Sequence, residues 1–186
     1  MAEDREQSAS IADLLAADDA EIAALFERHA AAIENQGPAV ACDRLIGRIC
    51  ETLSIQRLAE EEVLYPALRA SDDKLVFAFQ LAGLGISMRI GEIRQPGKER
   101  AARDFSVERL RELTRRNLME RSRILFPFVR GRLSPTQMVW LGDDYQQRKS
   151  GLWTNAVQVP RPIARKSVPV ALWHKRAPRR DDLHPR

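Results

Sequence analysis

Residues 56–69 read QRLAEEEVLYPALR, and residues 117–130 read NLMERSRILFPFVR. Aligned on Pro66 and Pro127, both stretches place two large apolar residues and an aromatic residue directly before the proline, and both place an arginine three residues after it. Apolar residues recur in each stretch at the spacing of one helix face, and polar residues interrupt both faces. The repeat therefore predicts two equivalent helices whose core-facing sides carry polar groups.

Helical periodicity also extends outward from these two stretches, and we find no convincing alternating strand. A short turn or helix is expected from Ser10, with Asp13 completing a capping-box pattern, and a longer helix from Asp18 to Asn35. A third apolar-periodic segment covers about 73–94, Ser106 is expected to cap the helix that carries the second quoted stretch, and a shorter helix runs from Ser134 to about Lys149. Short connections favour antiparallel neighbours, so the sequence predicts an all-α, up-down antiparallel four-helix bundle with a short fifth helix.

The expected core-facing positions of the long helices alternate four and three residues apart. In the helix of the first stretch they are Cys42, Ile46, Ile49, Leu53, Gln56, Glu60, Val63 and Ala67; in the helix of the second they are Leu110, Thr114, Asn117, Arg121, Ile124 and Phe128. Asp19 fits the same rhythm in the first helix, between Leu15 and Ile22, and Gln80 flanks the face of the third helix beside Phe79. Every long helix thus directs polarity inward, where a charge is costly unless it is paired.

These stretches resemble the hemerythrin-like (HHE cation-binding) family. The resemblance rests on LLAADDAEIAALF, LSIQRLAEEEVLYPALR and LTRRNLMERSRILFPFVR, in this order, and covers about residues 10–149. It implies a bundle whose metal ligands are a His and a Glu in each of the two repeated helices, an Asp-His pair in the first helix and a His in the third. Those positions here are Gln56 and Glu60, Asn117 and Arg121, Asp18-Asp19, and Gln80.

Of the His and Glu positions that the resemblance implies, only Glu60 keeps the implied residue. A non-haem di-iron site needs several imidazoles and bridging carboxylates, whereas the chain has three histidines, His29, His174 and His184. Two of these lie near the C-terminus, and His29 is about 15 Å along its helix from Asp19. We therefore expect no metal or cofactor. The remaining site positions, Asp19, Gln56, Glu60, Gln80, Asn117 and Arg121, should form a polar layer.

Within that layer, the resemblance places Glu60 and Arg121 at two carboxylate positions that face each other. We expect them to form an ion pair, because a buried Glu60 without a metal needs a counter-charge and a guanidinium suits a carboxylate. Asp19 is expected to accept from the same guanidinium, with Gln56, Gln80 and Asn117 satisfying the remaining donors and acceptors. The alternative is a di-iron protein with altered ligands that binds or senses oxygen, nitric oxide or iron.

Charge divides the chain at about residue 150. Residues 151–186 hold eight Lys and Arg and two acids, or +6, so the net charge of +4 leaves −2 for the rest, and five of the ten prolines follow residue 150. The sequence predicts a bundle over 1–149 and a basic, largely unpacked tail over 150–186. The tail is suited to an unknown protein partner or an anionic surface. No recognised nucleic-acid fold accompanies it, so nucleic acid is weakly supported.

The remaining sequence features indicate a cytoplasmic protein without enzymatic activity. There is no secretory signal, no membrane span is expected, and Cys42 and Cys50 lie too far apart on one helix to form a disulfide. There is no cysteine–histidine pairing and no Gly-x-Ser-x-Gly motif, so no catalytic residue is predicted. The expected function is that of a metal-free scaffold or regulatory interaction module.

Overall fold

A computed structural model describes residues 9–97 and 99–158 of the chain, with the side chains of 156–158 excepted. Over these ranges the protein is helical and contains no strand, which confirms the all-α prediction. The predictions that fall on residues 159–186, including the basic and proline-rich segment, lie outside the described residues.

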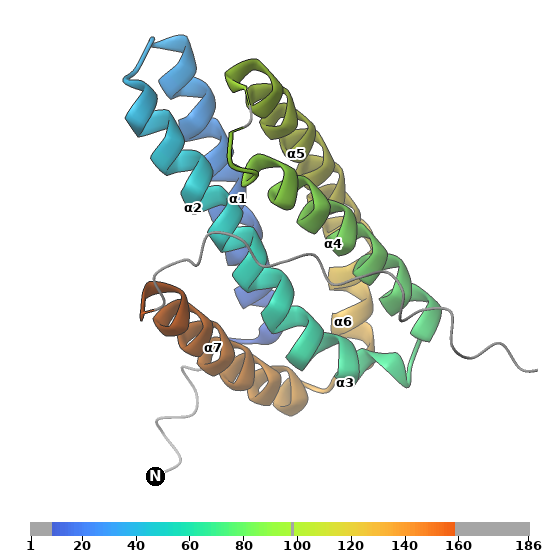
Figure 1. Ribbon diagram of the computed structural model, residues 1–186. Helices are drawn as coiled ribbons and strands as arrows, with labels where there is room; N and C mark the ends of the chain where they lie inside the picture. Colours follow the sequence, from blue (N-terminus) through green and yellow to red (C-terminus); the bar gives the residue numbers. More distant parts are fainter. Residues whose placement is uncertain (1–8, 98, 159–186) are drawn as a thin grey trace, which may run out of the picture.

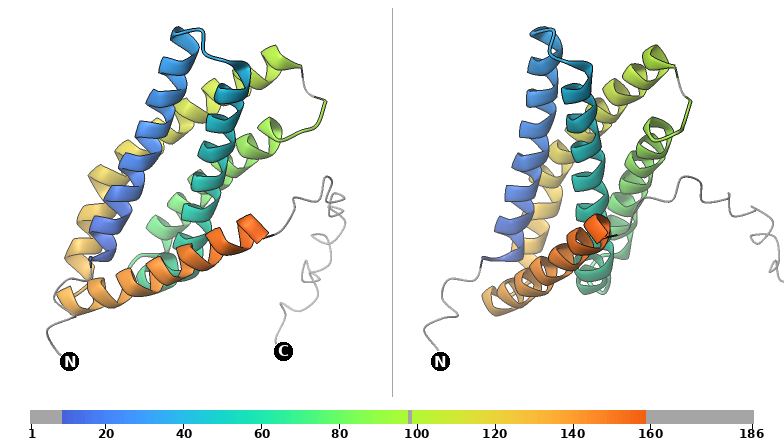
Figure 2. Two further views of the ribbon diagram at one scale, coloured as in Figure 1. Left: turned by 90° about the vertical axis from the view of Figure 1, so that its left-hand side faces the viewer. Right: turned by 60° about the vertical axis from the view of Figure 1, so that its left-hand side comes forward.

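Four long helical rods run beside one another, and a further helix crosses one end of them (Figures 1 and 2). Helix α1 packs along α2, α4 packs along α5, and α7 contacts α1, α2 and the π-helical turn η2. Two of the rods, α2–η2–α3 and α5–η3–α6, are continuous through a π-helical turn. The elements are α1 (Ile11–Glu34), α2 (Ala39–Ala59), η2 (Glu60–Leu64), α3 (Tyr65–Arg69), α4 (Asp73–Ile93), α5 (Arg100–Glu120), η3 (Arg121–Leu125), α6 (Phe126–Arg132) and α7 (Pro135–Gln158).

Helix α1 is one continuous helix, so the prediction of a separate short segment before Asp18 was wrong. The predicted cap is present: the Ser10 Oγ accepts from the Asp13 backbone N–H at 3.3 Å and donates to the Asp13 carboxylate at 2.7 Å. Neither Pro nor Gly interrupts the helix after this cap. Leu15, before Asp18, and Ile22, after it, are both fully buried on the same side of the helix. Continuous burial of that face favours one helix over two.

Helix α5 begins earlier than predicted, at Arg100 instead of Ser106. Ser106 is buried inside the helix and donates its hydroxyl hydrogen to the carbonyl of Ala102 at 3.0 Å. Serine satisfies its hydroxyl in this way within helices as well as at caps. The predicted start of α7 at Ser134-Pro135 is correct, and a capping box forms there: the Ser134 Oγ accepts from the Gln137 N–H, and the Gln137 side chain accepts from the Ser134 N–H.

The repeated sequence corresponds to a repeated structural feature, a π-helical turn in each of the two rods. In η2 the N–H of Tyr65 donates to the carbonyl of Glu60, and in η3 the N–H of Phe126 donates to the carbonyl of Arg121. Each turn ends two residues before the proline, with one aromatic residue between them. A proline inside an α-helix has no N–H to donate and clashes with the carbonyl four residues earlier. The wider turn accommodates that proline without breaking the helix.

The π turns shift the core-facing register by one residue, which corrects the predicted core. After Glu60 the buried residues are Leu64 and Leu68, where the sequence indicated Val63 and Ala67. After Arg121 they are Leu125 and Val129, where it indicated Ile124 and Phe128; Ile124 is 48% exposed. Each π turn contains one residue more than an α turn, so a strict four-three count fails beyond it.

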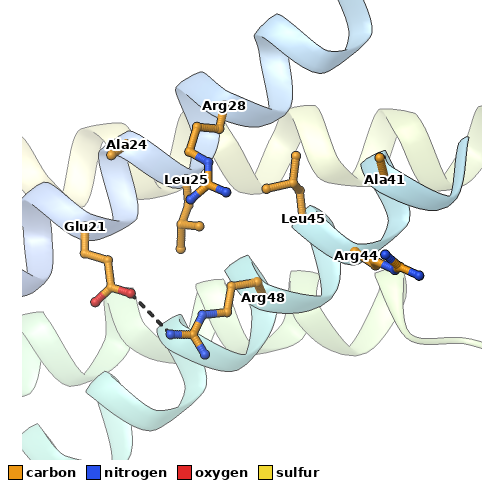
Figure 3. A pocket seen from close by; sticks show the side chains of 8 residues that line it. All are labelled: Glu21, Ala24, Leu25, Arg28, Ala41, Arg44, Leu45 and Arg48. Atoms are coloured by element: carbon orange, nitrogen blue, oxygen red, sulfur yellow. Dashed lines mark ion pairs between the residues drawn. The ribbon is translucent and has the colours of Figure 1, made fainter. Parts of the chain in front are cut away.

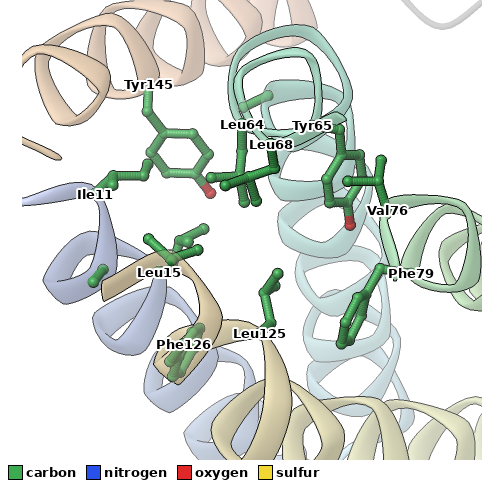
Figure 4. Packing of buried hydrophobic residues seen from close by; sticks show 13 residues of the cluster. Ile11, Leu15, Leu64, Tyr65, Leu68, Val76, Phe79, Leu125, Phe126 and Tyr145 are labelled. Atoms are coloured by element: carbon green, nitrogen blue, oxygen red, sulfur yellow. The ribbon is translucent and has the colours of Figure 1, made fainter. Parts of the chain in front are cut away.

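The buried apolar residues form two clusters that are separated along the rods. The cluster near α7 includes Leu15, Leu64, Phe79, Leu125 and Tyr145 (Figure 4). The other cluster includes residues from the opposite halves of the same helices, namely Ile22, Phe26, Ile49, Leu53, Ile86, Ile90 and Leu110. Along α1, α2 and α5 the two clusters are interrupted at the positions of the predicted polar layer.

Helix α7 extends to Gln158, so the predicted boundary near Lys149 was wrong. No proline occurs between Pro135 and Pro160, and nothing else in that interval stops the helix. Residues from the part assigned to the tail pack on the folded body: Leu152 contacts the cluster near α7, and the Arg48 guanidinium lies 4.2 Å from the centre of the Trp153 ring. The prediction of an unpacked segment is therefore incorrect for these residues.

Candidate functional site

Arg121 is the centre of a buried ion-pair network that joins three rods. Its Nε donates to the Asp19 Oδ2 at 2.8 Å, and its Nη1 donates to the Glu60 Oε2 at 2.8 Å while lying equally close to Oε1. Arg121 and Glu60 are each 3% exposed. Arg121 is the first residue of η3 and Glu60 the first of η2, so each π turn begins with a member of the network. The predicted pairing of Glu60 with Arg121, and the contact of Asp19 with the same guanidinium, are both present.

Each carboxylate in the network also accepts from a neutral donor. The Gln56 Nε2 donates to the Asp19 Oδ1 at 2.9 Å, and the Tyr65 hydroxyl donates to the Glu60 Oε2 at 3.0 Å. Residues five apart in an α-helix point about 140° away from each other. The π turn between Glu60 and Tyr65 reduces that separation and permits the contact. We call Asp19, Gln56, Glu60 and Arg121 the polar layer.

Asp18 forms a second buried contact, with α7. The Tyr145 hydroxyl donates to the Asp18 Oδ2 at 2.7 Å, and the Lys149 ammonium pairs with the Asp18 Oδ1. Sequence reasoning assigned no role to Tyr145, Lys149 or Tyr65. A signal for two of them exists, because Tyr145 and Lys149 are four residues apart and therefore share one face of the fifth helix.

The polar layer holds two carboxylates and one guanidinium, which leaves one excess negative charge when all three are ionised. Burial raises the pKa of Asp19 above its usual range, although Arg121 and the hydrogen bond from Gln56 oppose that shift. Burial also acts to lower the pKa of Arg121, but Glu60 and Asp19 outweigh it and raise that pKa. Arg121 is therefore permanently charged, and Asp19 is a carboxyl group of the layer whose ionised form burial disfavours.

A small cavity of about 30 Å³ adjoins the polar layer. Within the described part of the chain, the Arg121 Nη2 and the buried Thr114 Oγ1 have no protein hydrogen-bond partner, and the Glu60 Oε1 has only its ion-pair contact with the Arg121 Nη1. Gln56 and Asn117 also line this cavity, and Asn117 is half-buried. The volume suits one or two waters, which would bond the free donor and acceptor atoms.

The structure brings four of the six predicted site residues together. Asn117 lies at the cavity wall without a hydrogen bond to the layer, and Gln80 lies apart from it. Gln80 instead accepts from the Arg69 Nη2 near the exposed side of α4, at 3.4 Å. The position of α4 that faces the layer belongs to Gly83, where an added Cβ would lie 3.2 Å from the Arg57 side chain. The prediction that Gln80 contributes to the layer was therefore wrong.

The residues present do not fit the di-iron centre that the resemblance implies. The guanidinium of Arg121 bridges Asp19 and Glu60, the two carboxylates that a cation would need, and its positive charge opposes a dication. In the ranges that the structure describes, no three His, Cys, Asp or Glu side chains are grouped as metal ligands. His29 is buried in the other half of α1, where burial lowers its pKa.

A second, solvent-open feature is a groove of about 560 Å³ between α1 and α2 (Figure 3). Leu25 and Leu45 lie among its apolar lining residues, and its charged residues are Glu21 and three arginines, Arg28, Arg44 and Arg48. Arg48 pairs with Glu21 at 3.5 Å. Arg28 and Arg44 leave the groove with an excess of positive charge, which would attract acidic groups. The exposed pair of Arg48 with Glu21 contributes little to stability.

Comparison with family models, with curated proteins and with solved structures finds no match for this chain.

Proposed function

We propose that this protein is a metal-free member of the hemerythrin-like class, in which an internal ion-pair layer replaces the metal centre and the helical body serves as a scaffold or interaction module. The observation that carries the proposal is the placement of Arg121 between Asp19 and Glu60. The guanidinium supplies the positive charge that two buried carboxylates need. Four rods that lie beside one another, with α7 across one end, are compatible with an up-down four-helix bundle plus a fifth helix.

The non-enzymatic part of the proposal rests on how the buried polar groups are used. Asp19, Glu60 and Arg121 bond one another and neutral donors, and Asp18 bonds Tyr145 and Lys149. The adjoining cavity accommodates water more readily than an organic substrate. The features with unused recognition capacity lie on the outside, in the arginine-lined groove and on the outer side of α4. Recognition of another macromolecule uses such surfaces.

Elemental analysis and absorption spectra of protein purified from iron-replete cells test the metal-free proposal. We expect no stoichiometric iron, and a melting temperature that a chelator leaves unchanged, because the ion pairs hold the fold without a metal. About two irons per chain with an oxo-bridge band, or a chelator-sensitive melting temperature, would overturn the proposal in favour of the iron-binding alternative.

A ligand-restored variant makes the same test sharper. The combined changes Asp19→His, Gln56→His, Asn117→His and Arg121→Glu return imidazoles and a carboxylate to the layer. Arg121→Met is the matched control, since it removes the cation without adding a ligand. We expect iron to bind the restored variant more tightly than either the wild type or the control. Equal iron binding by all three proteins would contradict the assignment of these positions as a substituted metal site.

A further inference from the structure

The outer side of α4 is an apolar stripe that no described element covers. Phe77, Leu81, Leu84 and Met88 are 63%, 56%, 53% and 63% exposed and are spaced four, three and four residues apart. This spacing places all four on one side of the helix, opposite the buried face of Val76, Phe79, Ile86 and Ile90. No charged residue occurs between Leu75 and Met88.

The stripe is unusual within this molecule. Helix α4 is long and apolar enough to span a membrane by length and composition, yet only 28% of its most apolar window is buried within the chain. Its neighbour α5 is far more polar on average, and the outer face of α5 carries charged residues such as Arg109, Glu112 and Arg116. Contiguous exposed apolar surface of this kind marks an interaction site.

We infer that α4 pairs with α4 of a second copy, antiparallel, across a two-fold axis that passes between Leu81 and Leu84. In this arrangement Leu81 of each copy faces Leu84 of the other, and Phe77 faces Met88. The four-three-four spacing is the seam of a two-helix contact, and it is self-complementary under an isologous two-fold axis. The inference gives the proposed interaction module its partner, and so builds on that proposal.

Glycines beside the stripe support a close helix approach. An added Cβ at Gly85 or Gly91 would meet nothing within 4 Å, so packing inside this chain does not require glycine at either position. Glycine inside a helix is less favourable than alanine. Gly91 follows Met88 on the same side of α4, so antiparallel pairing places it under the Phe77 ring of the second copy. The absent side chain gives the ring room there.

The charges at the two ends of α4 select the antiparallel orientation. Asp73 and Lys74 begin the helix, whereas Glu92 and Arg94 lie at its end. Antiparallel pairing brings Lys74 near Glu92 and Asp73 near Arg94 of the second copy, and parallel pairing would bring like charges together. A lipid surface fits less well, because interfacial helices carry Lys and Arg along the polar face and often Trp on the apolar one, and α4 has no Trp and begins with an acid.

The size of the contact predicts a reversible dimer. A helix of 21 residues is about 31 Å long, and one helix pair of that length belongs at the small end of specific interfaces. Sedimentation equilibrium of the full chain should therefore show a monomer–dimer equilibrium. Leu84→Glu should abolish the dimer without loss of helicity. Trp140→Glu is the matched control, because Trp140 is a comparably exposed apolar residue on α7 (60%), and it should leave the equilibrium unchanged.

Disulfide cross-linking tests the register. In a background of Cys42→Ser and Cys50→Ala, a mixture of the Phe77→Cys and Met88→Cys proteins should form a hetero-disulfide on mild oxidation. Each protein alone should not cross-link, because two copies of position 77 would lie about 16 Å apart and a disulfide needs Cα atoms within about 7 Å. Cross-linking by each single protein alone would overturn the antiparallel register.

Two further results would overturn the inference. One is a wild type that stays monomeric at all attainable concentrations. The other is a monomer that floats with phosphatidylcholine vesicles and loses that binding on Leu84→Glu, which would assign the stripe to a lipid surface. Iron content measured on the same samples separates this outcome from failure of the metal-free proposal, since dimerisation through α4 does not involve the polar layer.

Discussion

Arg121 balances two buried carboxylates, so the members of the polar layer are not equivalent. Removing Arg121 leaves Asp19 and Glu60 without a cation, whereas removing Glu60 leaves Asp19 and Arg121 as a neutral pair. Loss of one partner of a buried pair typically costs about 3–5 kcal/mol, because the other charge is stranded. Because the layer carries an excess negative charge, we expect the loss of Arg121 to cost an amount at the upper end of that range and the loss of Glu60 to cost less.

Single and double substitutions test this asymmetry through denaturant unfolding. We expect Arg121→Met to lower the free energy of unfolding by more than Glu60→Leu does. The double variant should lose much less than the sum of the two single losses, because it strands fewer charges in an apolar interior. Additive losses, or a larger loss for Glu60→Leu, would contradict the assigned network.

Asp19 should make the stability of the protein depend on pH. Its pKa is raised by burial, so the folded protein holds this proton more tightly than the unfolded chain does. The stability contributed by Asp19 is therefore greatest in acid and falls as the pH rises from the unfolded value of about 3.9 through the raised pKa. Thermal unfolding from about pH 4 to about pH 8 should show the wild type losing stability relative to Asp19→Asn over that interval. A constant difference would show that Asp19 stays ionised.

At the scale of the element, the π turns connect the prolines to the site. Each turn lets a rod continue through a proline and also places Glu60 or Arg121 at its first position. An α turn with one residue fewer would keep the same face toward the core, but it would expose the proline to the clash that the π turn avoids. The turn and the proline should therefore be energetically coupled.

Deletion of Ser122, an exposed residue of η3, tests that coupling. We expect the deletion alone to cost about 3 kcal/mol, the usual penalty of proline inside an α-helix. Pro127→Ala alone should change stability little, and the deletion combined with Pro127→Ala should recover most of the loss. Thermal unfolding of the three variants measures this. A deletion that is equally harmful with and without Pro127 would show that the π turn has another cause.

At the scale of the whole molecule, α7 crosses the end of the rods and contacts two of them. Tyr145 of α7 donates to Asp18 of α1, and Trp153 of α7 packs against the Arg48 guanidinium of α2. A chain truncated after Lys149 loses Leu152 and Trp153, so we expect its melting temperature to fall by several degrees. A chain truncated after Gln158 keeps both residues, and the proline-rich composition that follows predicts little change. Equal melting temperatures for the two truncations would show that the end of α7 contributes nothing.

The same two chains test the basic segment as a binding element. All eight Lys and Arg residues after position 150 follow Gln158. Any binding of the full chain to DNA or to anionic vesicles should therefore disappear in the chain truncated after Gln158, and it should weaken steeply with salt. Binding retained by that truncated chain would instead assign the anion affinity to the arginine-lined groove between α1 and α2.

The amino-acid sequence by itself determined the helical class, the positions of the long helices and the inward placement of Asp19, Gln56, Glu60 and Arg121, because apolar periodicity and the cost of buried charge are local properties of a pattern. Tertiary structure alone decided the register beyond each π turn, the exclusion of Gln80 in favour of Gly83, and the contacts of Tyr65, Tyr145 and Lys149. A four-three count assumes a uniform α-helix, and it contains no information about which neighbour fills the space opposite a side chain. Those choices depend on how rods distant in the sequence pack together.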